Sequence, residues 1–102
     1  MADRMELQKK LCSILGSNNV YFEPPENIKI NYPCFIYSIE SPYTTGANNK
    51  LYSYVNSYSV TYIDRNPCIE IIEKMLLSFT YATTGSSYVS DGLHHYTFDI
   101  FF

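Results

Sequence analysis

The sequence predicts one α+β domain over residues 1–102, in which two helices flank a mostly antiparallel, four-stranded sheet with a long projecting β-hairpin. Two stretches place apolar residues at helical spacing, and four stretches are rich in the aromatic and β-branched residues that strands favour. Their order along the chain is α-β-β-α-β-β. A chain of this length supports one hydrophobic core.

The composition is that of a globular protein with many aromatic side chains. Eleven Tyr and six Phe make up 17% of the chain, and charged residues also make up 17%, below the usual ~25%. Tyr suits strands, and it also suits surfaces that become buried on assembly, so both interpretations stay open. The net charge of −3 argues against binding driven by nucleic-acid phosphates.

The first predicted element is a helix over residues 3–15, with Asp3 as its N-cap and Gly16 at its end. A proline pair makes residues 20–31 an extended connector, in which a short strand near residues 20–22 stays open. The predicted apolar stripe of the helix comprises Met5, Leu7, Leu11, Ile14 and Leu15.

Two strands follow, over residues 33–40 and 50–63, with a polar loop between them. The second is long for a strand, which predicts either an arm that projects past the body or a bulge near residues 56–57. Alternation places Tyr52, Tyr54, Tyr58, Val60 and Tyr62 on one side, and Leu51, Val55 and Ile63 on the other.

The second helix is predicted to begin at Asn66, as a capping residue, with Pro67 in the first helical position, and to end near Ser78. Asp64 and Arg65 directly precede it, and we interpret Asp64, Asn66 and Pro67 as a structural helix start. The side of the helix predicted to face the core carries Ile69, Ile72 and Leu76, with Met75 and Leu77 beside them.

The C-terminal part predicts a hairpin of residues 79–90 and 93–102 across Asp91-Gly92, a dipeptide typical of type I′ turns. A tight turn pairs Ser90 with Leu93 and continues from there. The predicted core face then carries Tyr81, Ser87, Val89, His94, Tyr96, Phe98, Ile100 and Phe102, and the opposite face carries Tyr88, Leu93, His95, Thr97, Asp99 and Phe101.

The sequence gives no basis for predicting an enzyme, a metal site or a cofactor. His94 and His95 are strand neighbours, so they point to opposite faces and cannot share one metal ion. Cys12, Cys34 and Cys68 fall on three elements without a CxxC motif, which predicts free thiols in a reducing compartment. The charged N-terminus is unlike a signal peptide, and the apolar runs are too short to span a membrane.

Three segments together resemble a known family. They are residues 32–37 (YPCFIY), 58–67 (YSVTYIDRNP) and 91–98 (DGLHHYTF), which include a Val-Thr-x-Ile-Asp-x-x-Pro passage and an Asp-x-Leu-x-His hairpin. In this order they resemble the tail-terminator, or tail-completion, proteins of long-tailed bacteriophages in their Gram-positive and clostridial branch. These proteins are often described as minor tail or head–tail joining proteins. Gly92 stands where Asn is more familiar, and it suits the same turn.

The resemblance implies a structural virion protein assembled in the bacterial host cytoplasm. It implies a hexameric ring at the head-proximal end of the tail, which ends growth of the tail tube. The implied partners are further copies of the chain, the tail tube protein and the neck or connector proteins of the head. No membrane and no sequence-specific nucleic acid is implied, although the genome passes through such a ring.

We expect the contacts between copies on the hairpin tip and on the sheet face away from the core. Two alternatives stay open: a head-side neck or stopper protein, and a small α+β module that binds a ligand or RNA. Ring size, neighbours and the contractile or non-contractile nature of the tail stay open too. The expected interface residues are Tyr43, Thr44, Thr45, Asn48, Asn49, Lys50, Tyr52, Tyr54, Tyr88, His95 and Phe101.

Overall fold

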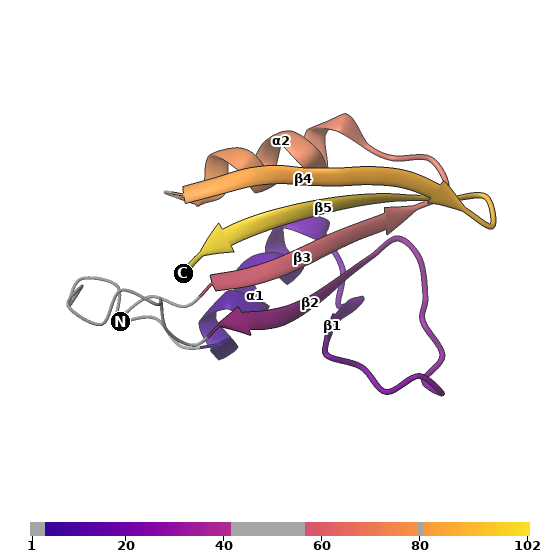
Figure 1. Ribbon diagram of the computed structural model, residues 1–102, viewed down its shortest axis with the longest axis horizontal. Coiled ribbons are helices and arrows are strands. Elements are labelled where there is room, and N and C mark those ends of the chain that lie inside the picture. Colours follow the sequence, from indigo (N-terminus) through magenta and orange to yellow (C-terminus); the bar gives the residue numbers. More distant parts are fainter. Residues whose placement is uncertain (1–3, 42–56, 80) are drawn as a thin grey trace.

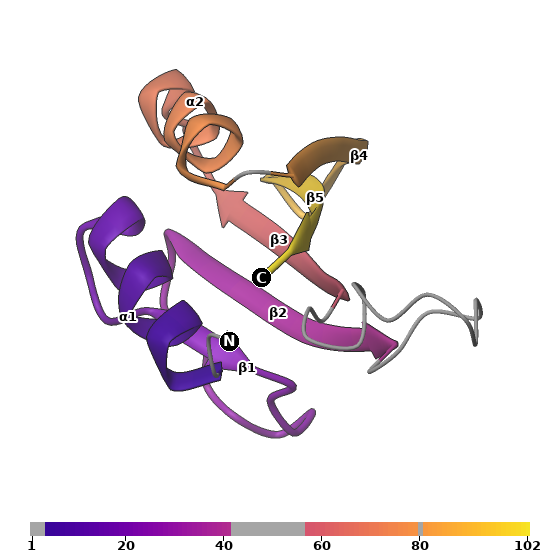
Figure 2. The same ribbon diagram turned by 90° about the vertical axis from the view of Figure 1, so that its left-hand side faces the viewer.

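In the computed structural model, which describes residues 4–41, 57–79 and 81–102, a single twisted sheet carries two helices on one of its faces (Figures 1 and 2). This confirms the predicted α+β class. The elements are α1 (Arg4–Leu15), β1 (Val20–Phe22), β2 (Cys34–Ser41), β3 (Ser57–Asp64), α2 (Ile69–Ser78), β4 (Tyr81–Ser90) and β5 (Leu93–Phe101).

The sheet of the described residues has five strands in the order β1-β2-β3-β5-β4, and it is mixed. The prediction of four mostly antiparallel strands is therefore wrong in detail. The added strand is β1, three residues that run parallel to β2 at one edge, while the other neighbours are antiparallel. The sequence left a short strand near residues 20–22 open, and the pairing of β1 with β2 shows that it forms.

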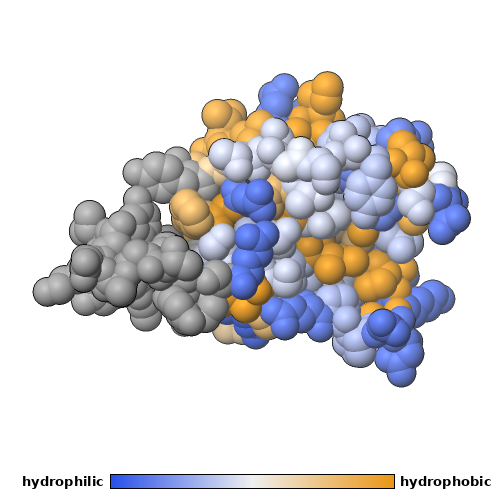
Figure 3. Space-filling model, viewed as in Figure 1, coloured by the Kyte–Doolittle hydropathy of each residue, from blue (hydrophilic) through white to orange (hydrophobic). Residues whose placement is uncertain are grey.

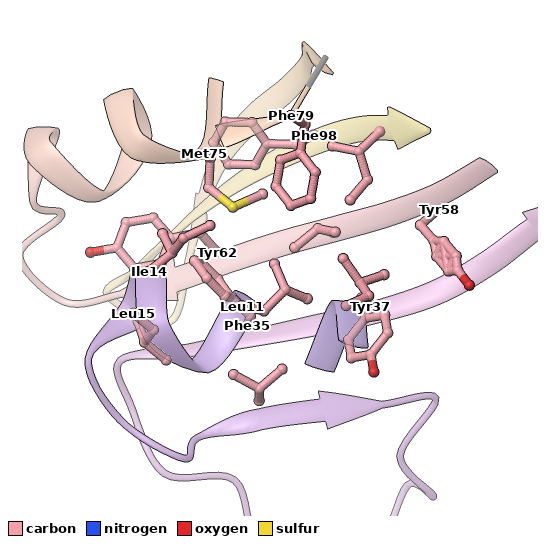
Figure 4. Close-up of a cluster of buried hydrophobic side chains, with 14 residues drawn as sticks. Leu11, Ile14, Leu15, Phe35, Tyr37, Tyr58, Tyr62, Met75, Phe79 and Phe98 are labelled. Carbon is pink, nitrogen blue, oxygen red and sulfur yellow. The ribbon is translucent and has the colours of Figure 1, made fainter. Parts of the chain in front are cut away.

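The core lies between the helices and one face of the sheet, and Figure 4 shows its aromatic centre. Tyr58, Val60 and Tyr62 of β3 are all buried, which confirms the side predicted for this strand. The predicted stripe of α1 is buried except for Met5, which is 52% exposed because it lies in the first turn, at the margin of the sheet. The neighbouring strands contribute Phe35, Tyr37, Phe98 and Ile100.

Side-chain hydrogen bonds tie α1 to β1 and β2. The Tyr37 hydroxyl donates to Gln8 Oε1 at 2.6 Å, and it accepts from the Arg4 guanidinium at 3.1 Å. The Gln8 amide in turn donates to the Val20 carbonyl at 3.0 Å, which satisfies a backbone group of the short edge strand. The helix ends at Gly16, whose φ of 82° and N–H bond to the Cys12 carbonyl form an αL cap, as predicted.

Tyr62 connects the end of β3 to the start of α2. Its hydroxyl donates to Asp64 Oδ2 at 2.6 Å and accepts from the Cys68 N–H at 3.0 Å. The other Asp64 oxygen accepts the Asn66 N–H at 3.2 Å. The helix N-cap is Cys68, without a side-chain cap, so Asn66 is not the cap and Pro67 is not the first helical residue. The prediction missed this because the Asp64 turn occupies the residues that would otherwise start the helix.

The face of α2 that is buried differs from the predicted one. Met75 is fully buried, whereas Ile69 is 68% exposed and Leu77 is 84% exposed. The reason is the position of the helix. Figures 1 and 2 both show α2 beside and beyond the edge strand β4, away from the middle of the sheet, so one flank of the helix has no strand beneath it.

The β4–β5 hairpin has the predicted turn, since Asp91 and Gly92 both have positive φ, as a type I′ turn requires. Pairing follows the predicted register from Ser90 to Ser87, and a bulge between Thr84 and Ser87 then shifts it by one residue. Tyr81 therefore pairs with Phe101 and not with Phe102, as a register unchanged from the turn would require. Val89 was also predicted to face the core, but it is 61% exposed because the turn end of the hairpin extends past the packed part of α2.

The predicted strand over residues 50–63 is confirmed for its described part, which is β3. The hairpin tip expected over residues 43–54 lies outside the described residues. With it lie the interface candidates Tyr43, Thr44, Thr45, Asn48, Asn49, Lys50, Tyr52 and Tyr54.

Replacing Tyr62 by Phe is expected to lower the free energy of unfolding by about 1–3 kcal/mol, because the change removes a bond to a carboxylate and the acceptor of the Cys68 N–H. Urea denaturation measures the difference. Tyr88→Phe, which alters a half-exposed side chain, serves as the control and should stay within about 0.5 kcal/mol of the wild type. Equal losses in both variants would contradict the role assigned to Tyr62.

Asn66→Ala is expected to change the free energy of unfolding by less than about 0.5 kcal/mol, because the Asn66 side chain is exposed and only its backbone N–H is used. Asp64→Ala removes the acceptor of two hydrogen bonds, so it should cost about 1–3 kcal/mol. The same denaturation measurement compares them. A larger loss for Asn66→Ala than for Asp64→Ala would restore Asn66 as the cap.

Candidate functional site

The candidate site is the sheet face that points away from both helices, which we call the open face. Side chains alternate between the two faces along each strand. Cross-strand pairs with buried side chains therefore alternate with pairs whose side chains point to the open face. Figure 2 shows both helices on the opposite side, and Figure 3 views the open face directly. Its described members include Tyr21, Cys34, Ile36, Ser38, Glu40, Ser59, Thr61, Ile63, Tyr88, His95, Thr97, Asp99 and Phe101.

Three sequence-predicted interface residues, Tyr88, His95 and Phe101, lie on the open face. Tyr88 is 53% exposed and Phe101 is 40% exposed, which is high for aromatic side chains in strands. Tyr88 and His95 come from neighbouring strands, whereas Phe101 lies at the far end of β5. The structure thus places the three on one surface but only the first two in contact.

The rings of Tyr88 and His95 are stacked. Their centroids are 4.5 Å apart and their planes differ by 8°. His95 Nδ1 lies 3.1 Å from the Leu93 carbonyl oxygen, which fixes the ring orientation. The pair forms a flat, partly exposed aromatic surface near the turn end of the hairpin.

The end of the open face nearest β1 and the Asp64 turn is closed to solvent. Cys34 is fully buried and its strand neighbour Ile63 is 6% exposed. Burial, with a smaller contribution from the negative charge of Asp64, raises the pKa of the Cys34 thiol to about 12. The thiol is therefore protonated at neutral pH, so it is unsuited to act as a nucleophile or as a metal ligand.

Two carboxylates meet on the open face. Glu40 follows the regular part of β2, where a bulge separates Ile39 from Ser41, and its side chain lies against Asp99 of β5 and Ser59 of β3. Desolvation, followed by the charge and the hydrogen bond of Asp99, raises the pKa of Glu40. Nothing in the local sequence pattern marks Glu40, because its contact with Asp99 depends on the bulge and on the order of β2, β3 and β5.

Among the described residues, no group of three His, Cys, Asp or Glu side chains is arranged to hold a metal ion. His94 pairs with Asp64 and His95 pairs with Ile63, so the two imidazoles leave the strand on opposite faces, as the sequence predicts. Cys12, Cys34 and Cys68 are free thiols on α1, on β2 and at the start of α2. Neither helix in the described ranges has the length and apolar character needed to cross a membrane.

Comparisons of the chain with protein-family models, with curated proteins and with solved structures found no match.

The raised pKa of Glu40 predicts a pH-dependent stability. The folded state holds this proton more tightly than the unfolded state, so the stabilisation is fully present below the unfolded pKa and is lost as the pH rises through the folded pKa. Glu40→Gln should therefore raise the thermal midpoint at pH 7, and the gain should vanish near pH 4, below the ordinary Glu pKa of about 4.3.

The control for this measurement is Glu73→Gln, which changes an exposed carboxylate on α2 away from Asp99. Thermal melts of both variants at several pH values separate the local effect from the change in net charge. A gain for Glu40→Gln that is equal at pH 4 and pH 7 would contradict the like-charge pair.

Proposed function

We propose that the chain is a structural assembly protein that binds other protein subunits through the open face, and that its role is that of a tail terminator in a long-tailed bacteriophage. In this role, copies form a closed ring, expected to be a hexamer, at the head-proximal end of the tail. The ring ends growth of the tail tube and joins it to the neck.

The observation that carries the proposal is the composition of the open face. Antiparallel sheets often leave one face exposed to water. The side chains on such a face are usually polar or charged. The described part of this face instead combines Tyr88, His95 and Phe101 with serine and threonine side chains. Aromatic residues with few charges are typical of surfaces that bind other proteins. The resemblance of residues 32–37, 58–67 and 91–98 to tail terminators supplies the specific role.

The charge of the face favours a protein over RNA as its partner. A stacked Tyr88 and His95 resemble the aromatic platforms on which RNA-binding sheets stack bases. However, the charged side chains of the described open face are the carboxylates Glu40 and Asp99, which repel phosphates. The net charge of −3 acts in the same direction.

The assembly prediction is tested with Tyr88→Ser and His95→Ser, which remove the exposed aromatic surface without touching the buried core. Both variants should stay folded by circular dichroism and lose the ring seen by native mass spectrometry or on isolated tails. Leu77→Ser, on the helix side of the molecule, is the matched control and should assemble normally. Loss of rings in the control, or intact rings in both open-face variants, would contradict the proposal.

Inactivation of the gene in the producing phage separates the candidate roles. A tail terminator predicts tails of uncontrolled length, whereas a neck or stopper protein predicts tails of normal length that fail to join heads. Filter binding with generic RNA at moderate salt tests the third candidate, and we expect no retention. Normal infectious particles without the chain would exclude both virion roles.

A further inference from the structure

We propose that the groove between α2 and the edge strand β4 binds an extended segment of another protein chain, which adds to β4 as a further strand. The site lies on the helix side and at the edge of the sheet, and it borders the open face at Tyr88 and Thr97, which also line its cavities. It goes beyond the proposed function and does not depend on it.

The outer edge of β4 has features that favour the addition of a further strand. β4 ends the strand order of the described sheet, and its ten residues include no charge and no proline. Sheet edges are usually protected from further pairing by lysine, proline or very short strands, and the opposite edge strand β1 has only three residues. The β4 edge instead has only a bulge, between Thr84 and Ser87.

The register shows which backbone groups are available. In a two-residue hairpin the residues that flank the turn, here Ser90 and Leu93, form a hydrogen-bonded pair, and hydrogen-bonded and non-bonded pairs alternate beyond them. Ser87 and Val89 fall in non-bonded pairs, so their N–H and C=O groups point away from β5. These groups are the hydrogen-bonding positions for an added strand.

The apolar flank of α2 also favours an added strand. Ile69, Ile72 and Leu76 follow helical spacing along one flank, and Ile69 and Leu76 are 68% and 37% exposed. Ile72 lines a cavity of about 270 Å³ with Thr84–Ser87 of β4 and with β5, so this flank faces the edge strand. A side chain of an added strand that points to the helix side would pack against this flank.

The cavities extend the groove along β4. A second one, of about 260 Å³, is lined by Ser87, Tyr88, Val89, His94 and Tyr96. It shares Ser87 and Tyr96 with the first, so the two lie end to end along the strand. Each is smaller than the ~300–1,000 Å³ of most small-molecule sites. A row of small cavities suits successive side chains of an extended peptide better than one compact ligand.

A second copy of the chain is a poor occupant on steric grounds. If two β4 strands paired antiparallel about a two-fold axis, both α2 helices would stand on the same face beside the joint. Neighbouring strands are about 4.8 Å apart, whereas packed helix axes need about 8–10 Å. Because α2 lies beside and beyond β4 in both views, the two helices would overlap (Figures 1 and 2). The occupant is therefore a strand without a helix on that side.

Charge gives the chemistry of the partner. By helical spacing Glu73 lies beside the apolar flank of α2, and Asp91 lies where β4 ends. β4 itself is neutral, and Glu70 and Lys74 are i, i+4 neighbours of opposite charge on the outer side of the helix, so neither sign dominates there. A segment that complements this groove has apolar residues at alternate positions in its middle and Lys or Arg at its ends.

The experiment is an NMR titration of the labelled full chain with a ten-residue peptide that alternates valine and threonine between terminal lysines, up to about 1 mM. We expect saturable shifts confined to amides of α2 and β4. The control peptide has the same ends and prolines at alternate central positions, and it should not bind. Absence of shifts with the first peptide, or shifts centred on Ser59 and Thr61 of the open face, would overturn the proposal.

Two pairs of variants sharpen the result. Ile69→Ser should weaken binding at least about threefold. Leu77→Ser, which removes a similarly apolar side chain from the outer side of α2, should not weaken it. Val89→Pro removes one outward N–H and should also weaken binding, while Val89→Thr should retain it. Equal effects in each pair would exclude strand addition. Sedimentation that shows dimers abolished by Val89→Pro would assign the edge to a second copy and overturn the proposal.

Discussion

The fold depends on how the hydroxyl of Tyr62 is satisfied inside the core. Tyr62 is fully buried in the central strand β3, and an unpaired hydroxyl there costs about 1–3 kcal/mol. Asp64 and the Cys68 N–H supply its partners, which requires the chain to turn back immediately after β3. That turn delays the start of α2 to Ile69 and directs the helix towards β4. The exposed flank of α2 and the groove beside it follow from this position.

The buried tyrosines also shape the core on the helix side of the sheet. The core is aromatic, and its three buried tyrosines direct their hydroxyls to the periphery of the cluster, as Figure 4 shows. Tyr37 reaches the polar side chains of α1, and Tyr62 reaches the Asp64 turn. Large rings fill the single layer between sheet and helices, so the core is complete on that side. The opposite face is left with hydroxyl, aromatic and acidic side chains.

Local patterns in the sequence predicted the class, five of the main elements nearly to their ends, the Asp91-Gly92 turn and the buried side of β3. They failed where tertiary contacts decide. Whether residues 20–22 form a strand stayed open, because β1 depends on its pairing with β2 and on its bond to Gln8. The bulge in β4, which shifts a register that the turn alone sets correctly, was not predicted. The wrong flank of α2 was predicted to be buried. Helical spacing shows which residues lie on one flank, but not which flank has a strand beneath it. Of the candidate site, Tyr88, His95 and Phe101 followed from alternation alone. Glu40 did not, because its contact with Asp99 depends on strand order.

The two surfaces differ in a way that matters for assembly. A closed ring of identical subunits needs a heterologous interface, in which each copy offers two unlike surfaces. A surface that pairs with itself yields a dimer and stops there. The position of α2 opposes pairing of two β4 edges, and the carboxylates Glu40 and Asp99 oppose stacking of two open faces on each other. Both surfaces therefore disfavour a two-fold contact with their own copy, and each is suited to an unlike partner. This is the property that growth of a closed ring and recruitment of a different protein chain both require.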